Sequence, residues 1–241
     1  MTLREKINVP RQRERQEPRI SLNKLGEYLA EKNASRRTGI VADQKRPKDA
    51  VVPYYDLARD VAVSFLAGEI SRDAVLDEMQ RLFSAPEPRQ WFKGRNLSCA
   101  YALEHFLSRF ENVLEGDLIK VVPVEKTVSS VLLISGVRVS VRPDVLLFGI
   151  DRSGHDFVGA IKLHFPRAYP LNSESGQYVA TVLHQYIEGT YAAEDVKASR
   201  SHCIVIDVFS GEKYVAPAAY KRRRKDIAAG CQQIAALWPR V

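Results

Sequence analysis

Charged residues interrupt two apolar segments in the second half of the chain, and this pattern constrains the fold more than any other. Asp144 follows Pro143 at the head of one apolar run, and Lys162 lies within another, over 157–165. Both runs have the length and the apolar content of β-strands. If the second strand is internal, an unpaired Lys162 ammonium is costly, because burial removes its hydration. We therefore expect Lys162 to meet a carboxylate or a bound anion beside the strand of Asp144.

Hydrophobic periodicity predicts an α/β fold, with a small mixed β-sheet flanked by helices and a helical N-terminal extension. The chain divides into a flexible basic arm over 1–19, a helical region over 20–89 and an α/β domain over 90–241. One predicted helix starts after Ser21, and the others cover 35–43, 54–66, 71–83, 96–113, 174–191 and 219–237. The predicted strands cover 118–125, 131–141, 143–149, 157–165 and 202–209.

The composition favours a polyanionic partner and argues against several classes of protein. A formal net charge of +7 over 241 residues favours nucleic acid as a partner, without requiring it. The three cysteines are widely spaced and form no CxxC pair, so we expect buried, reduced thiols rather than a zinc ribbon or a disulfide framework. No GxxxxGK[ST] loop indicates a nucleotide-driven motor. No stretch approaches about 18 consecutive apolar residues, so we expect a cytoplasmic protein without membrane contact.

The order of these elements, together with the two charged residues, resembles the PD-(D/E)XK nuclease superfamily. The resemblance covers about residues 92–210 and rests on Pro143-Asp144 and Lys162, which lie on consecutive predicted strands between helices. It implies a restriction-endonuclease-like core and cleavage of phosphodiester bonds with Mg²⁺ or Mn²⁺ as cofactor. In that superfamily an aspartate holds the metal and a lysine positions or activates the attacking water. The resemblance therefore assigns the metal ligand to Asp144 and the catalytic lysine to Lys162.

The second acidic position of the motif is Ala160 in this chain, and an alanine cannot ligate a metal. Three explanations stay open: the carboxylate has moved to a nearby element, the protein has lost cleavage, or the sequence is an inactivated variant. Glu174, at the start of the following helix, is the first candidate for a displaced carboxylate. Glu104 and Glu111 are the others, because the superfamily often adds a glutamate from the preceding helix and their spacing places both on one helical face. The alternative for these two residues is a solvated helix surface.

A run of cations opens the last predicted helix and suggests how nucleic acid is held. Lys221, Arg222, Arg223 and Arg224 form this cluster, which either grips phosphates independently of base sequence or is a solvated surface. Gln177, on the helix over 174–191, is a further candidate contact with the phosphate backbone.

Two more polar residues lie within predicted strands. His164 shares a strand face with Ala160 and Lys162, because side chains alternate across a strand. It either contacts nucleic acid or is a hydrogen-bonded residue of the core. Asp207, within the strand over 202–209, is expected at the solvent-facing end of that strand.

Two functions from different classes follow from these patterns. The first is a PD-(D/E)XK-like, metal-dependent nuclease, an endonuclease or exonuclease, with DNA favoured over RNA as the substrate. The second is a catalytically degenerate relative that binds DNA or serves as a scaffold subunit in a multi-protein DNA-processing or defence system. In that case the helical region over 20–89 is expected to dock a protein partner. A plain α/β protein without a nucleic-acid partner remains the third alternative.

Overall fold

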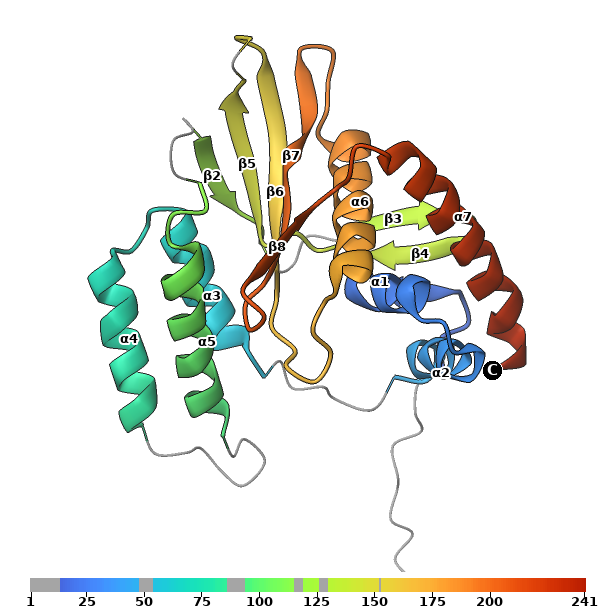
Figure 1. Ribbon diagram of the computed structural model, residues 1–241, viewed down its shortest axis with the longest axis horizontal. Helices are drawn as coiled ribbons and strands as arrows, with labels where there is room; N and C mark the ends of the chain where they lie inside the picture. The colour runs from blue at the N-terminus through green and yellow to red at the C-terminus, as the bar shows by residue number, and fades with distance from the viewer. Residues whose placement is uncertain (1–13, 48–53, 86–93, 115–118, 126–129, 152) are drawn as a thin grey trace, which may run out of the picture.

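A five-stranded mixed sheet forms the centre of the molecule (Figure 1). The computed structural model describes residues 14–47, 54–85, 94–114, 119–125, 130–151 and 153–241. The strand order is β2 (Ile119–Pro123), β5 (Val145–Ile150), β6 (Asp156–His164), β7 (Val196–Asp207) and β8 (Glu212–Val215). All neighbours in this sheet are antiparallel except β6 and β7, which run parallel. The prediction of an α/β fold with a mixed sheet is confirmed at this level.

A second, three-stranded sheet contains β1 (Arg19–Ser21), β4 (Val137–Ser140) and β3 (Val131–Ile134) in that order. The single strand predicted over 131–141 is therefore wrong, because the chain turns back at Ser135 and Gly136. Both turn residues have positive φ angles, 45° and 80°, which is the backbone geometry of a tight hairpin. Glycine adopts this conformation without strain.

Helices cover both faces of the central sheet (Figure 1). On one face lies α6 (Ser173–Thr190), the crossover between the parallel strands β6 and β7. Three further helices lie on the same side: α1 (Leu22–Ala30), α2 (Ala34–Lys45) and α7 (Tyr220–Leu237), which a short 3₁₀ turn follows at Trp238–Arg240. The other side carries α3 (Asp56–Leu66), α4 (Arg72–Ser84) and α5 (Arg95–Phe110).

The alternation of side chains along the strands divides the buried apolar residues into two cores. Val145 and Ile161 belong to the core with α3, α4 and α5, whereas Leu146 and Ala160 belong to the core with α1, α6 and α7. Burial of these side chains is the main stabilising contribution of both layers. The helices between residues 20 and 85 thus pack on the two faces of the sheet. The predicted boundary at 89/90 lies outside the described residues.

Two details of the chain's periphery differ from the sequence expectations. Residues 19–21, at the junction of the predicted arm and helical region, form β1, which pairs in parallel with β4. The strand β8 was not predicted; it is only four residues long and half of it is exposed. Among the helices of the described ranges, none is long and apolar enough to cross a bilayer.

Candidate functional site

Asp144 and Lys162 meet where β5 and β6 pair. The register joins Val145 to Ile161, so Asp144 lies opposite Lys162 on the neighbouring strand. The backbone of Asp144 is fixed on both sides, since its N–H donates to Ile161 O at 2.8 Å and its carbonyl accepts from Val124 N–H at 3.0 Å. Lys162 Nζ lies 3.0 Å from Asp144 Oδ2. Each residue is only 8% exposed, so the ammonium has a buried carboxylate as its partner.

One further hydrogen-bond donor and one further cation engage the Asp144 carboxylate. The backbone N–H of Leu163 donates to Oδ2 at 2.6 Å. Arg59, on α3, brings its Nε to within 3.2 Å of Oδ1, and its guanidinium also lies 5.4 Å from the centre of the Phe165 ring. Both oxygens of Asp144 are therefore held by protein groups.

Burial lowers the pKa of Lys162 below its ordinary value, because the ammonium loses its hydration. The Asp144 charge and hydrogen bond oppose this shift, whereas the charges of Arg59 and Arg142 add to it. The lysine is thus held in a site where its proton is less firmly bound than in water. A lysine of this kind is a candidate functional group, although buried structural ion pairs have the same signature.

The pair lies at a cavity of about 340 Å³ between α3 and the sheet. Asp56 and Asp60 line it from α3, and Glu125 lines it from the segment after β2. With Asp144 these make four carboxylates, and the cationic residues on the same wall are Arg59, Arg142 and Lys162. The cavity is therefore strongly polar, with opposite charges interleaved.

The donor chemistry of this cavity suits a hard cation, but its arrangement does not. Carboxylate oxygens are the ligands that Mg²⁺ prefers. However, both oxygens of Asp144 are already engaged by Lys162, Leu163 N–H and Arg59. Within the described parts of the chain, no three Asp, Glu, His or Cys side chains come close enough together to hold a metal ion. The residues present do not form a metal site in this arrangement.

Ala160 occupies a fully enclosed position. It has no exposed surface and lies in the core on the α6 side of the sheet, opposite Leu146 on β5 and Cys203 on β7. A carboxylate there would have to be buried among apolar groups. An unpaired charge in such a place costs far more than the roughly 2–7 kcal/mol of an uncompensated neutral polar group.

The three predicted substitutes for the missing carboxylate do not line this cavity. Glu174 is exposed in the first turn of α6. Glu104 is exposed on α5, and Glu111, just after that helix, forms an ion pair with Arg72 of α4 at 2.9 Å. The structure thus brings Asp144 and Lys162 together but leaves these glutamates elsewhere on the surface.

Sequence reasoning missed the acids that do line the cavity. Asp56 and Asp60 are four residues apart and therefore lie on one face of α3. The helical spacing was readable, but nothing in the sequence pattern showed that this face would meet Asp144. Glu125 had no comparable signal.

The cationic cluster of α7 divides into two groups. Arg223 donates to Gln177 and stacks on the Tyr178 ring, 4.6 Å from its centre. Arg224 forms an ion pair with Glu188 and lies 3.0 Å from His184 Nδ1. These two arginines, and Gln177 with them, join α7 to α6. The exposed cations at this end of α7 are Lys221 and Arg222 of the cluster and Lys225, which follows it.

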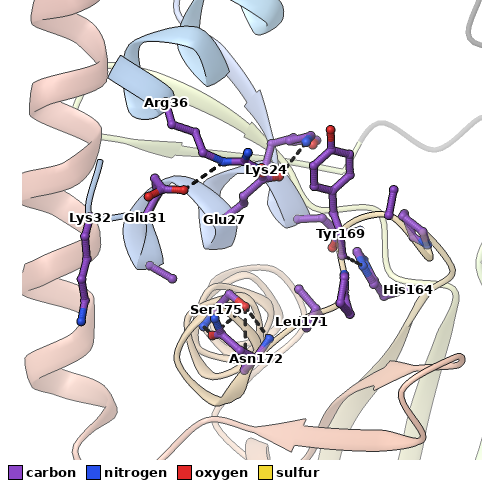
Figure 2. Close-up of a pocket in the computed structure, with 16 residues that line it drawn as sticks. Lys24, Glu27, Glu31, Lys32, Arg36, His164, Tyr169, Leu171, Asn172 and Ser175 are labelled. Carbon is purple, nitrogen blue, oxygen red and sulfur yellow. Dashed lines mark hydrogen bonds and ion pairs between the residues drawn. The ribbon is translucent and has the colours of Figure 1, made fainter. Parts of the chain in front are cut away.

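His164 and Asp207 are both buried, at 3% and 1% exposure. The Asp207 carboxylate accepts from Leu171 N–H at 2.7 Å and from Ser210 N–H at 3.1 Å. The expectation that Asp207 lies at a solvent-facing strand end is therefore wrong, because these amides of two connections satisfy it inside the protein. His164 Nε2 lies 2.8 Å from Tyr169 O. His164 also lines a second cavity, between α1 and the start of α6 (Figure 2).

Compared with known proteins, the chain matches no protein-family model and no curated protein sequence. Only the geometry described above bears on what the chain does.

Proposed function

We propose that the chain is a nuclease-like protein that binds the phosphate backbone of nucleic acid, with the Asp144–Lys162 site closed to cleavage. The observation that carries this proposal is that protein groups contact both carboxylate oxygens of Asp144. Lys162, Leu163 N–H and Arg59 engage both of its oxygens. The site is built as a buried ion-pair network, and such networks tie elements together without any ligand.

The order of elements supports the nuclease-like part of the proposal. Helix α5 precedes β2, β5 and β6, and α6 then leads to β7, parallel to β6. The resemblance to the PD-(D/E)XK superfamily implies this order of one helix, three strands, a crossover helix and a further strand. Asp144 immediately precedes the second of these strands, and Lys162 lies on the third.

The basic surface of α7 supports the binding part. Lys221, Arg222 and Lys225 are exposed near the start of this helix, and no described carboxylate forms an ion pair with them. Exposed cations of this kind bind phosphates with an affinity that falls as salt rises, because each contact releases counterions. A net charge of +7 attracts a polyanion to this surface.

A second candidate function, metal-dependent cleavage, is favoured by one observation. Asp56, Asp60 and Glu125 line the same cavity as Asp144 and Lys162. A carboxylate that has moved to α3 would substitute for the one missing at Ala160, provided that Arg59 first releases Asp144.

Binding of a short duplex, measured at several salt concentrations, tests the proposal. The triple variant Lys221→Gln, Arg222→Gln, Lys225→Gln removes the three exposed cations. The slope of the logarithm of the binding constant against the logarithm of the salt concentration is expected to fall in size by about one unit for each phosphate that the variant no longer neutralises. Lys213→Gln, which removes an exposed cation on β8, is the matched control. An unchanged slope in the triple variant would remove the α7 surface from the proposal.

A further inference from the structure

The largest described cavity lies apart from the Asp144 site. It has a volume of about 630 Å³ and lies between α1, the 166–172 connection and the first turn of α6 (Figure 2). That volume is within the range of small-molecule sites, roughly 300–1,000 Å³. No residue of this cavity lines the Asp144 cavity.

The charged residues of the cavity leave room for an anion. Lys24 forms an ion pair with Glu27 at 2.6 Å, and Arg36 does so with Glu31 at 2.9 Å. Lys32 also lines the cavity, and it forms no ion pair with any described residue. The lining thus contains three cations and two carboxylates, an excess of one positive charge, although Lys32 points away from Lys24 and Arg36 (Figure 2).

An exposed aromatic ring accompanies these cations. Tyr169 is 49% exposed, and Lys24 Nζ and the Arg36 guanidinium lie 4.4 and 5.6 Å from the centre of its ring. Figure 2 shows the ring and both cationic side chains on the same side of the cavity. Aromatic rings beside cations are the combination with which proteins hold the bases and phosphates of single-stranded nucleic acid.

The cavity also contains a buried polar atom without a partner. Because the Tyr169 carbonyl can only accept, His164 Nε2 carries the proton of their hydrogen bond, and Nδ1 of the neutral ring is left as an acceptor. Burial lowers the pKa of His164, which favours this neutral form. Nδ1 has no donor among the described residues.

The two cavities lie at neighbouring points of one strand. Lys162 lines the first and His164 the second, two residues further along the same face of β6. Two residues of a strand span about 6–7 Å.

From these observations we infer that the cavity between α1 and α6 binds one nucleotide unit of single-stranded nucleic acid, as a phosphate together with an unpaired base. This inference rests on the proposed binding of nucleic acid and adds a subsite with a defined ligand. The phosphate lies by Lys24 and Arg36, and the base lies against Tyr169.

Titration of the whole chain with dAMP, inorganic phosphate and deoxyadenosine, without metal, tests the inference. We expect dAMP to bind more tightly than either fragment. Tyr169→Ala is expected to weaken dAMP roughly tenfold, the loss of one base–aromatic stack, and to leave phosphate unchanged. Arg36→Gln is expected to weaken dAMP and phosphate but not deoxyadenosine. Tyr101→Ala, at a 38% exposed ring on α5, is the matched control.

Two results would overturn the inference: no binding of dAMP at millimolar concentration, or binding of dAMP that Tyr169→Ala and Arg36→Gln both leave unchanged. The variant that lacks the three exposed cations of α7 separates this inference from the proposed function. It should keep its affinity for dAMP. Failure of the unmodified protein to bind the duplex, with intact dAMP binding, would count against the proposed function alone.

Discussion

Lys162 Nζ lies 3.0 Å from Asp144 Oδ2, in a part of the sheet from which water is almost excluded. The two residues do not depend on each other equally. Asp144 also has Arg59 and the Leu163 amide as partners, whereas Asp144 is the one carboxylate among the described residues that forms an ion pair with Lys162. The Asp144 carboxylate is therefore the centre of the network, and Lys162 relies on it for its counter-charge.

This asymmetry predicts unequal losses of stability. Asp144→Ala leaves a buried ammonium without a counter-charge and should lower the free energy of unfolding by about 3–5 kcal/mol. Lys162→Met removes the ammonium but leaves Asp144 with two partners, and should cost about 1–3 kcal/mol. Urea denaturation measures both values. Equal losses, or a larger loss for Lys162→Met, would show that Arg59 and Leu163 N–H do not support the carboxylate.

The close approach of α1 to α6 predicts a steric effect at Gly26. A Cβ at this position would meet Val179 Cγ2 and would lie 2.9 Å from the backbone oxygen of Ser175. Gly26→Ala should therefore destabilise the protein by about 1–3 kcal/mol. Gly39→Ala, in α2, meets no atom within 4 Å and should stabilise by about 0.5–1 kcal/mol, because alanine favours the helix. Opposite signs in thermal denaturation are the expected result, and a neutral Gly26→Ala would contradict the packing of these helices.

The buried imidazole of His184 predicts a loss of stability in mild acid. Burial, followed by the charge of Arg224, lowers the pKa of His184 below its ordinary value of 6.5, while Glu188 opposes the shift. As the pH decreases below 6.5, the unfolded chain therefore takes up this proton before the folded chain does. The free energy of unfolding then decreases, by at most about 1.4 kcal/mol per pH unit for one proton.

Melting temperatures at pH 7.5 and pH 5.5 measure this effect. The difference should be smaller in His184→Gln than in the unmodified protein. His155→Gln, at an exposed residue between β5 and β6, should leave the difference unchanged. An equal difference in all three proteins would show that His184 is not the group responsible.

The burial of the three cysteine thiols predicts that they react slowly with thiol reagents in the folded state. Cys99, Cys203 and Cys231 are free and buried, as the sequence predicts. Burial raises the pKa of Cys203 and Cys231 to about 12 and also raises that of Cys99. A thiol reagent such as DTNB at pH 8 should therefore modify none of them until the protein is denatured, since the thiolate is the reacting form. Rapid modification of the native protein would show that one of these side chains is accessible.

Local patterns predicted β5, β6 and the central pair because these signals lie within single elements. The apolar runs around Asp144 and Lys162 predicted β5 and β6, and the cost of burying an ammonium predicted a carboxylate partner. The helices were predicted to within a few residues from their periodicity and from caps such as Ser71, whose side chain accepts from Ala74 N–H.

Features that depend on distant parts of the chain could not be predicted. The side chain of Arg59 reaches Asp144 across 85 residues of sequence, and no periodicity encodes which face of α3 turns to the sheet. The division of the α7 cluster depends on Gln177 and Glu188, which contact Arg223 and Arg224 only when α6 and α7 pack together. Asp207 was misplaced for the same reason, since the amides that satisfy it come from two connections outside its strand.

Cleavage of plasmid and single-stranded DNA in Mg²⁺ or Mn²⁺, compared between the unmodified protein and Asp144→Asn, tests the central claim most directly. Because asparagine keeps the size and part of the hydrogen bonding of aspartate, circular dichroism should show that the variant is folded. A closed ion-pair network predicts that both proteins bind DNA at low salt and that neither cleaves it through this site. Metal-dependent cleavage by the unmodified protein that is lost in folded Asp144→Asn would contradict the account and establish the cavity of Asp144, Asp56 and Asp60 as an active site.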